Sequence, residues 1–381
     1  MVLLHHARKN SLLHNGHRHL KQTTPTKWHY LLPKDTYFVN IDHRELTAVA
    51  ARIFTAIGCE QAEADIVSKL LVTANLVGHD SHGVARIPRY VEYCRNGEVV
   101  PNQTATATFE NAQIAIYDGN KGFGQSIGVQ IMAAGIEKAR NNGIAMIGVG
   151  NVGHLGRIGD WTEMAIEAGQ VSMHFVNTSG AGMTVAPFGG VESRYATNPI
   201  SIGMPNPSGD PLVFDAATSM LAEGKIMVAR NKGIDLPDGA LTGSDGSPTN
   251  NPNALYEKPS AVMNSMGAHK GSGLAIMADL LAGSLGGGGC AQPGVTGLAN
   301  GMLSILIDPN VFTDASFVQT ETTRFTDWVR SARPANPAKP VLLPGDPERN
   351  TRMEREKNGI PLDETTWRLI QETATSLEVT T

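Results

Sequence analysis

The run Ile144-Ala-Met-Ile-Gly-Val-Gly-Asn-Val-Gly153 determines how the middle of this chain is interpreted. Its first four residues predict a buried strand, and its glycines match the G-x-G-x-x-G spacing of dinucleotide-binding folds. A helix predicted over residues 158–168 and a strand over residues 171–176 complete a strand–helix–strand unit. The pattern therefore predicts an α/β protein and, taken literally, a Rossmann-type cofactor site.

The residues after this unit weaken the Rossmann interpretation. Such a fold places an acidic residue about 20 positions further on, where it binds the cofactor ribose. Here Asn177, Thr178 and Ser179 occupy that position. Because the chain contains 41 glycines, a chance match to the glycine spacing is also common. From these residues alone, a Rossmann unit and another kind of glycine-rich strand both stay open.

Outward from this run, apolar periodicity predicts alternating helices and strands. Two amphipathic helices are expected over residues 42–59 and 61–77, and a third over residues 125–142. Residues 235–253 are rich in Gly, Asp, Pro and Asn, which predicts a long surface loop. The remaining strands are predicted over residues 114–117, 200–204, 212–219 and 302–307, and the remaining helices over 220–230, 274–285 and 350–378.

The composition is that of an ordinary globular protein, with 381 residues, 41% of them hydrophobic and 18% charged. A net charge of −5 gives no indication of a nucleic-acid partner. No apolar run reaches the roughly 18 residues of a membrane span, so no membrane association is expected. Cys59, Cys94 and Cys290 lie far apart and lack metal-ligand spacing. We therefore expect no disulfide framework, no metal site and a reducing, cytoplasmic location.

The first 34 residues differ from the rest of the chain, since they contain no acidic residue but six basic residues and six of the 12 histidines. They offer too little periodic apolar surface to pack, so residues 1–38 are predicted to form a disordered basic leader. Mitochondrial targeting is the alternative, but Ser11 is the only serine among these 34 residues, where transit peptides are serine-rich.

The polar segment Gly78-His-Asp-Ser-His-Gly-Val-Ala-Arg86 follows the second predicted helix. His82 and Arg86, four residues apart, can face one cleft if a new helix starts there. Arginine grips a carboxylate with two hydrogen bonds, and a nearby imidazole can exchange a proton with the adjacent oxygen. This chemistry suits a 2-oxo acid/2-hydroxy acid pair. A helix cap or a surface pair is the alternative interpretation.

Two further residues, His154 and Asp215, are candidates for a role in the site, and a third, His174, is assigned to the fold. His154 lies among Gly153, Gly156 and Arg157, which favours an accessible ring and proton transfer, although simple loop packing is the alternative. His174, on an alternating strand, is interpreted as a satisfied sheet histidine. Asp215 ends a predicted strand, where it either binds a ligand or caps a helix.

The segment Gly267-Ala-His-Lys-Gly-Ser-Gly-Leu274 opens an apolar helix. Glycines, Lys270 and the free N–H groups of a helix start together form a possible phosphate cradle. The Walker spacing is absent, so this segment is not a P-loop, and a plain glycine-rich helix start stays the alternative.

Seven motifs, in this order along the chain, resemble the type-2 malate/L-lactate dehydrogenase family: Asp80-Ser-His-Gly-Val-Ala-Arg86, Gly153-His-Leu-Gly-Arg157, Ala186-Pro-Phe-Gly-Gly190, Thr197-Asn-Pro199, Phe214-Asp-Ala-Ala-Thr-Ser219, His269-Lys-Gly271 and Leu343-Pro-Gly345. The resemblance runs from about residue 39 to about residue 376. It implies a mixed α/β fold in which a non-Rossmann nicotinamide-binding domain joins a mostly helical domain built from both chain ends. It also implies a homodimer, and it replaces the Rossmann interpretation.

The resemblance also implies roles for individual residues. His82 matches the family's proton donor, while Arg86 and Tyr90 match substrate contacts. His154 matches a histidine assigned as proton acceptor in one family member, so the division of labour between the two histidines stays open. The residues that match contacts to the NAD or NADP cofactor are Thr178, Asp215, Ala216, Ala217, Lys270, Gly345, Asp346 and Pro347.

The expected function is hydride transfer between NAD(P)H and a small 2-oxo acid/2-hydroxy acid pair. The alternatives are reduction of a cyclic imino acid, in which C=N lies beside a carboxylate, and a catalytically silent cofactor-binding homologue. The expected organisation is a leader over residues 1–38, a first helical part over 39–115, a cofactor-binding domain over 116–300, and a return to the helical domain over 301–381.

Overall fold

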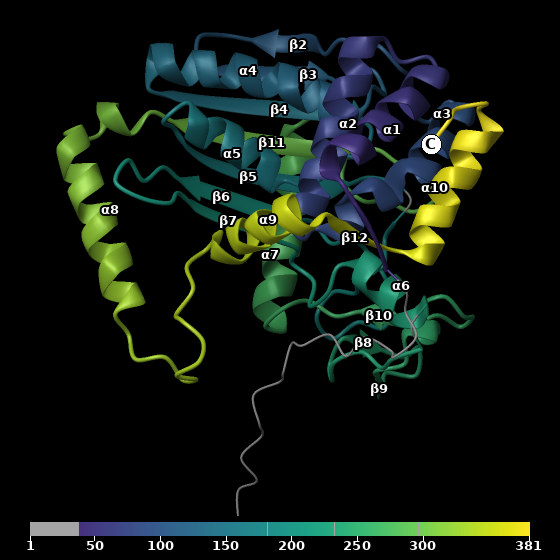
Figure 1. Ribbon diagram of the computed structural model, residues 1–381. Helices are drawn as coiled ribbons and strands as arrows, with labels where there is room; N and C mark the ends of the chain where they lie inside the picture. Colours follow the sequence, from purple (N-terminus) through teal and green to yellow (C-terminus); the bar gives the residue numbers. More distant parts are fainter. Residues whose placement is uncertain (1–37, 181, 232, 296) are drawn as a thin grey trace, which may run out of the picture. The chain divides into compact units, whose positions relative to one another are not determined.

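The computed structural model describes residues 38–180, 182–231, 233–295 and 297–381 (Figure 1). The predicted basic leader lies outside the described residues, apart from Phe38. Within the described part of the chain, no helix combines the length and the apolar character needed to cross a membrane.

A seven-stranded mixed sheet forms the centre of the described structure, and Figure 1 shows its strands in the order β2-β3-β4-β11-β5-β6-β7. Strands β3 and β4 are parallel, and every other neighbouring pair is antiparallel. The predicted α/β class is thereby confirmed. The strand bounds are β2 Thr106–Glu110, β3 Ile114–Asp118, β4 Ile144–Val152, β5 Val171–Thr178, β6 Ile200–Met204, β7 Leu212–Ala216 and β11 Asn300–Ile307.

The literal Rossmann interpretation is wrong, because β11 lies between β4 and β5 and runs antiparallel to both. The glycines of β4 serve packing instead. A Cβ atom on Gly150 would lie 2.3 Å from the Cα of Gly288, and one on Gly148 would lie 3.0 Å from the Cα of Gly286. Glycine at these positions therefore lets the backbone of residues 286–288 lie directly on the strand.

Helices cover both faces of the sheet, and side-chain alternation along β4 explains how. Ile147 and Val149 belong to the apolar cluster under α4 (Gly124–Asn142) and α5 (Gly159–Glu167), which also contains the fully buried Trp161. The intervening glycines face residues 285–288, at and just after the end of the π-helical turn Leu280–Leu285, which continues α7 (His269–Asp279). The sheet is thus buried on both sides, as its apolar central strands require.

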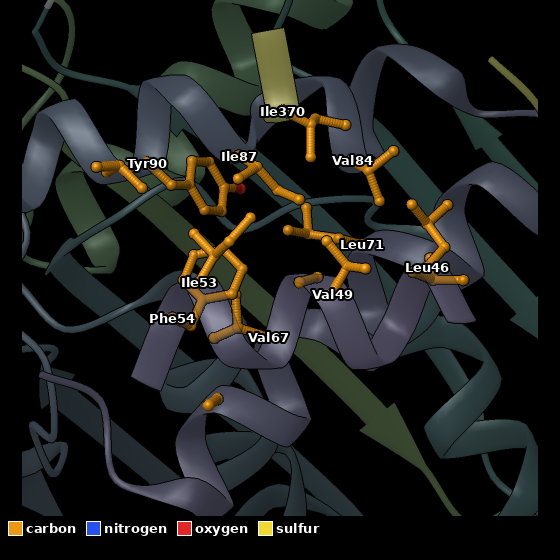
Figure 2. Close-up of a cluster of buried hydrophobic side chains, with 14 of the residues drawn as sticks. Leu46, Val49, Ile53, Phe54, Val67, Leu71, Val84, Ile87, Tyr90 and Ile370 are labelled. Carbon is orange, nitrogen blue, oxygen red and sulfur yellow. The ribbon is translucent and has the colours of Figure 1, made fainter. Parts of the chain in front are cut away.

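A second core belongs to the helical part, which is built from both ends of the described chain. Helices α1 (His43–Ala56), α2 (Gln61–Leu76) and α3 (Ile87–Arg95) pack with α10 (Glu364–Ser376). Figure 2 shows Ile370 of α10 beside side chains of the three N-terminal helices. The short strands β1 (Phe38–Ile41) and β12 (Ile360–Asp363) pair antiparallel and join the two ends.

The third core surrounds a small three-stranded sheet. Two of its strands lie in residues 235–253, which were predicted to form a loop. Its strands are β8 (Leu241–Thr242), β9 (Pro248–Thr249) and β10 (Val262–Met263), and α6 (Glu223–Asn231) packs beside them. The loop prediction was wrong at β8 and β9, because Leu241 is an apolar anchor in a turn-rich context.

Helix boundaries differ from prediction at several places. The helix predicted from residue 274 begins at His269, and the one predicted from residue 220 begins at Glu223. The predicted C-terminal helix is two helices, α9 (Asp346–Asn358) and α10, separated by β12. Helix α8 (Ala315–Arg330) was not predicted, and its large aromatic residues are exposed.

The four-part division with boundaries after residues 38, 115 and 300 stays a prediction. Strand β11 is a central member of the sheet. We therefore propose that the return to the helical part begins only after Ile307.

Candidate active site

The loop that carries His82 is shaped by a buried asparagine. After α2, two 3₁₀ turns, Asp80–His82 and Val84–Arg86, lead into α3. Asn75 Oδ1 accepts from the Val84 backbone N–H at 2.8 Å, and Asn75 Nδ2 donates to Asp80 at 2.7 Å. A Cβ on Gly83 would lie 2.0 Å from Asn75 Oδ1, so only glycine fits there. Sequence reasoning missed Asn75, although a polar residue within an apolar helix was its signal.

Helix α9 holds the same loop from the other side. Arg355 Nη1 contacts the Asp80 carboxylate at 2.6 Å, and His79 Nε2 lies 3.3 Å from Glu348 Oε1. Asp80 therefore has a structural role, and the C-terminal part of the chain helps to position the residues next to His82.

The two candidate catalytic histidines lie together. His82 comes from the loop between α2 and α3, and His154 follows β4, yet their rings stack with centroids 5.5 Å apart and planes inclined by 17°. Arg86 donates from Nε to the Ser81 carbonyl at 2.7 Å, which orients the guanidinium and leaves its two terminal nitrogens for a ligand. The structure thus brings the candidate residues His82, His154 and Arg86 close to one another.

Burial and positive charge keep both imidazoles neutral in the free site. Burial, with a smaller contribution from Arg86, lowers the pKa of His154 to about 3. Burial also lowers the pKa of His82 well below 6.5, and four neighbouring groups lower it further: His154, Arg86, His79 and Arg157. A bound carboxylate would offset these positive charges, so anion binding and protonation of a histidine favour each other.

Tyr90 is buried, and its hydroxyl contacts a histidine. Its hydroxyl oxygen lies 2.7 Å from His154 Nδ1, and Gln125 Nε2 donates to the same oxygen at 2.9 Å. Burial raises the pKa of Tyr90 to about 12, so the hydroxyl keeps its proton. Sequence reasoning missed Gln125, which had no signal beyond its place at a helix start.

The carboxyl edge of the sheet brings the predicted cofactor residue Thr178 near the segment that carries His154. Strands β3, β4, β5 and β7 run in one direction, so their carboxyl ends share one edge, where ligands bind in open α/β sheets. Asn300 Oδ1 accepts from the Leu155 N–H at 3.0 Å, and its Nδ2 donates to Thr178 Oγ1 at 2.9 Å. The Asn300 side chain therefore links Thr178 to the segment that carries His154 through two hydrogen bonds.

Asp215 is engaged by a buried ion cluster. Its carboxylate accepts from the Gly159 N–H at 2.8 Å, at the start of α5, and lies 3.9 Å from Arg157 Nε. Arg157, fully buried, also pairs with Asp160 and Glu163. The contact agrees with the alternative that Asp215 caps a helix. The helix whose N-terminus it contacts is α5, and not the helix that follows Asp215 in the sequence.

Lys270 lies in the first turn of α7, near the end of β7. The Met266 N–H donates to the Thr218 carbonyl at 2.9 Å, and Ser219 pairs with Ser265, so this segment runs beside residues 217–219. A Cβ on Gly271 would lie 2.1 Å from the Met266 carbonyl oxygen, which explains the glycine after Lys270. A lysine on the positive end of a helix suits a phosphate group.

The segment Gly345-Asp-Pro347 starts α9 beside β7. The Val213 N–H donates to the Pro344 carbonyl at 3.3 Å, and Gly345 has a φ of +95°. The Asp346 carboxylate accepts from the Leu343 N–H at 2.7 Å and pairs with Arg330 at 3.1 Å. Since its oxygens are engaged, a ligand here would meet the backbone of this segment.

His174 is a satisfied sheet histidine, as predicted. Its Nδ1 lies 2.8 Å from Ser304 Oγ and its Nε2 lies 3.0 Å from Ser172 Oγ. Both ring nitrogens are thus occupied within the sheet, away from the paired histidines.

The site places two histidines beside an arginine at the carboxyl edge of a mixed sheet. This arrangement is suited to an enzyme that binds an acid substrate and transfers a proton. Residues 41–371 match the family model described as malate/L-lactate dehydrogenase, and the chain belongs to this family.

Individual relatives agree with this assignment. The chain is 41% identical to hydroxycarboxylate dehydrogenase B of Escherichia coli K12, over 87% of this chain and 93% of the relative. It is 33% identical to an L-lactate dehydrogenase of Cupriavidus necator, over 85% and 94%. The solved delta1-piperideine-2-carboxylate reductase of Pseudomonas syringae superposes with a TM-score of 0.76 at 30% identity, over 88% of this chain and all of that one.

Proposed function

We propose that this protein transfers a hydride between a nicotinamide dinucleotide, NAD or NADP, and a 2-oxo acid/2-hydroxy acid pair. The observation that carries the proposal is the stacked pair of His82 and His154 beside the oriented guanidinium of Arg86. Relatives named as hydroxycarboxylate and lactate dehydrogenases support the same substrate class.

Each of these side chains has a part in the reduction of a 2-oxo acid. Arg86 binds the carboxylate through its terminal nitrogens, which fixes the neighbouring carbonyl beside the histidines. When bound, the nicotinamide supplies the hydride that carbon 2 accepts. The carbonyl electron pair then moves onto the oxygen, which takes a proton from an imidazolium. Oxidation of the 2-hydroxy acid runs through the same groups in reverse.

Binding of the substrate favours protonation of the histidine that donates this proton. In the free site, burial disfavours a charged His82, and the positive Arg86 adds to this effect. A carboxylate on Arg86 offsets the positive charge, so binding of the acid favours proton uptake.

Residues along the carboxyl edge fit a dinucleotide. The donor set combines a hydroxyl on Thr178 with a cation on Lys270 at a helix start, which suits ribose and phosphate groups. The segment Asp215–Ala217 ends β7, and Gly345–Pro347 lies beside that strand. Both would contribute mainly backbone groups, since both carboxylates are engaged within the protein.

A substrate panel tests the proposal. Small 2-oxo acids and cyclic imino acids are offered with NADH and with NADPH, and consumption of the reduced cofactor is followed by absorbance. We expect turnover of 2-oxo acids. Turnover confined to imino acids would instead favour the reductase alternative, which the similarity to the Pseudomonas enzyme makes worth testing. Cofactor binding without any turnover would identify a silent homologue.

We also propose that two copies of the chain form a homodimer that functions in the cytoplasm. Helix α8 supports the dimer, since Phe317, Phe325 and Trp328 are 58%, 52% and 67% exposed, an unusual density of aromatic surface. The three free cysteines support the proposed cytoplasmic location, and mitochondrial targeting by the leader stays the alternative.

A further inference from the structure

Gln125 belongs to a buried hydrogen-bond chain that ends on a catalytic histidine. It lies in the first turn of α4 and is 1% exposed. Its Nε2 donates to the Tyr90 hydroxyl oxygen at 2.9 Å, and that hydroxyl lies 2.7 Å from His154 Nδ1. The side chain therefore reaches the site only through Tyr90.

The chain determines where His154 carries its hydrogen. A tyrosine hydroxyl has one hydrogen to donate, and its oxygen already accepts from Gln125. If His154 also donated to that oxygen, the buried hydroxyl hydrogen would have no acceptor, which is unfavourable. Tyr90 therefore donates to Nδ1. A neutral imidazole has one N–H, so the hydrogen of His154 lies on Nε2, which has no hydrogen-bond partner within the described part of the chain.

His82 has no such constraint. Its Nδ1 lies 3.0 Å from Ser81 Oγ, and a serine hydroxyl can donate to a bare nitrogen or accept from a protonated one. The two stacked histidines thus differ: the environment of His154 fixes one protonation state, whereas that of His82 permits both.

We propose that Gln125 is a positioning residue that acts through Tyr90 to hold His154 as the Nε2–H tautomer, so that His154 is a neutral hydrogen-bond donor and His82 transfers the proton. This assignment rests on the proposed function for its chemical meaning. During reduction, carbon 2 accepts the hydride, the former carbonyl oxygen takes the proton of the His82 imidazolium, and His154 Nε2–H stabilises that oxygen while keeping its own proton.

The tautomer is measured directly by nitrogen NMR of the full-length protein, labelled in its histidine rings and free of substrate and cofactor. His154→Gln identifies the His154 signals. We expect the wild-type protein to show Nε2–H. In Gln125→Glu, the carboxylate accepts the Tyr90 hydrogen, so His154 must donate from Nδ1 and the tautomer should reverse. Gln130→Glu, the same change on the same helix, is the matched control and should resemble wild type.

A bare Nε2 in the wild-type protein would overturn the proposal, since it would mean that the Gln125 amide turns its oxygen toward Tyr90. An unchanged tautomer in a folded Gln125→Glu variant would also overturn it. If that variant does not fold, Gln125→Met is used: it removes the donor, so a mixture of tautomers is expected, and a single Nε2–H form would count against Gln125.

Kinetics give an independent readout. Gln125→Glu should lower kcat by roughly a hundredfold, the effect of losing one oxyanion donor, with little change in KM because Arg86 is untouched. Since the NMR measurement needs neither substrate nor cofactor, it stands whether or not 2-oxo acids prove to be substrates. If no 2-oxo acid proves to be a substrate, the NMR measurement still decides the tautomer of His154.

Discussion

Arg86 is the residue to which we assign recognition of the acid, and its geometry explains why a lysine would not replace it. The Nε hydrogen bond to the Ser81 carbonyl fixes the plane of the guanidinium, so its two terminal nitrogens are presented together. A lysine keeps the charge but offers a single ammonium without a fixed plane.

We therefore predict that Arg86→Lys raises KM for the acid about tenfold or more, with a smaller effect on kcat. Steady-state kinetics at saturating cofactor measure both constants. The control is Arg89→Lys, since Arg89 is exposed and contacts Tyr93 and Glu92 on its own helix. An unchanged KM in Arg86→Lys would remove Arg86 from the substrate site.

His82 is the group to which we assign the transferred proton. His82→Ala is expected to lower kcat by roughly a hundredfold or more, as loss of a general acid does, while the cofactor still binds. Cofactor binding is measured by fluorescence titration and turnover by absorbance. If His82→Ala turns over normally and His154→Ala is inactive, the two roles are reversed.

At the scale of secondary-structure elements, the site depends on how a loop is held between two helices. Asn75 of α2 reaches forward to Val84 and Asp80, while Arg355 of α9 approaches Asp80 from outside. Gly83 has an ordinary φ of −92°, so the need for glycine is spatial, and the nearest atoms that a Cβ would meet belong to Asn75.

Gly83→Ala should therefore displace Asn75 and destabilise the protein by about 1–3 kcal/mol, the range for overpacking or loss of a buried hydrogen bond. Denaturant unfolding measures the free energy. Gly209→Ala is the control, since a Cβ there meets only Asn206, a half-buried loop side chain, at 3.1 Å. Equal stability of the Gly83 variant and wild type would show that Asn75 moves without cost.

The start of α7 is the element to which we assign a cofactor phosphate. Lys270→Met should weaken nicotinamide dinucleotide binding about ten- to a hundredfold, the effect of losing a charged hydrogen bond. Affinity for the acid at saturating cofactor should barely change. NADH and NADPH are titrated separately: a loss confined to NADPH would place Lys270 at the 2′-phosphate, and equal affinities would contradict the assignment.

At the scale of the whole molecule, Phe317, Phe325 and Trp328 of α8 form an aromatic surface that is more than half exposed in the described part of the chain. Trp328→Asp combined with Phe317→Asp should convert a dimer into a monomer, because charges would be buried in an apolar contact. Light scattering after size-exclusion chromatography measures the mass. Phe109→Asp, on the edge strand β2, is the control and should stay dimeric. A monomeric mass for the wild-type protein would contradict the proposed homodimer.

Local sequence determined much of the element structure and most of the candidate residues. Alternating or three-to-four-residue apolar spacing predicted α1, α2, α4 and most sheet strands, because these periods report which face is buried. The chemistry of His82, Arg86 and His154 was also visible, since few cores tolerate so many polar groups. The motifs that carried the family resemblance are local as well.

Only the tertiary structure determined which residues meet. The glycines of β4 resembled a cofactor fingerprint, and their contact with residues 286–288 shows that they serve packing. Asn75, Gln125 and Asn300 act on residues 9, 35 and 145 positions away. No periodicity encodes such distances, because a hydrogen bond across the fold depends on how the elements pack. For the same reason, the stacking of His82 on His154 is a property of the folded chain.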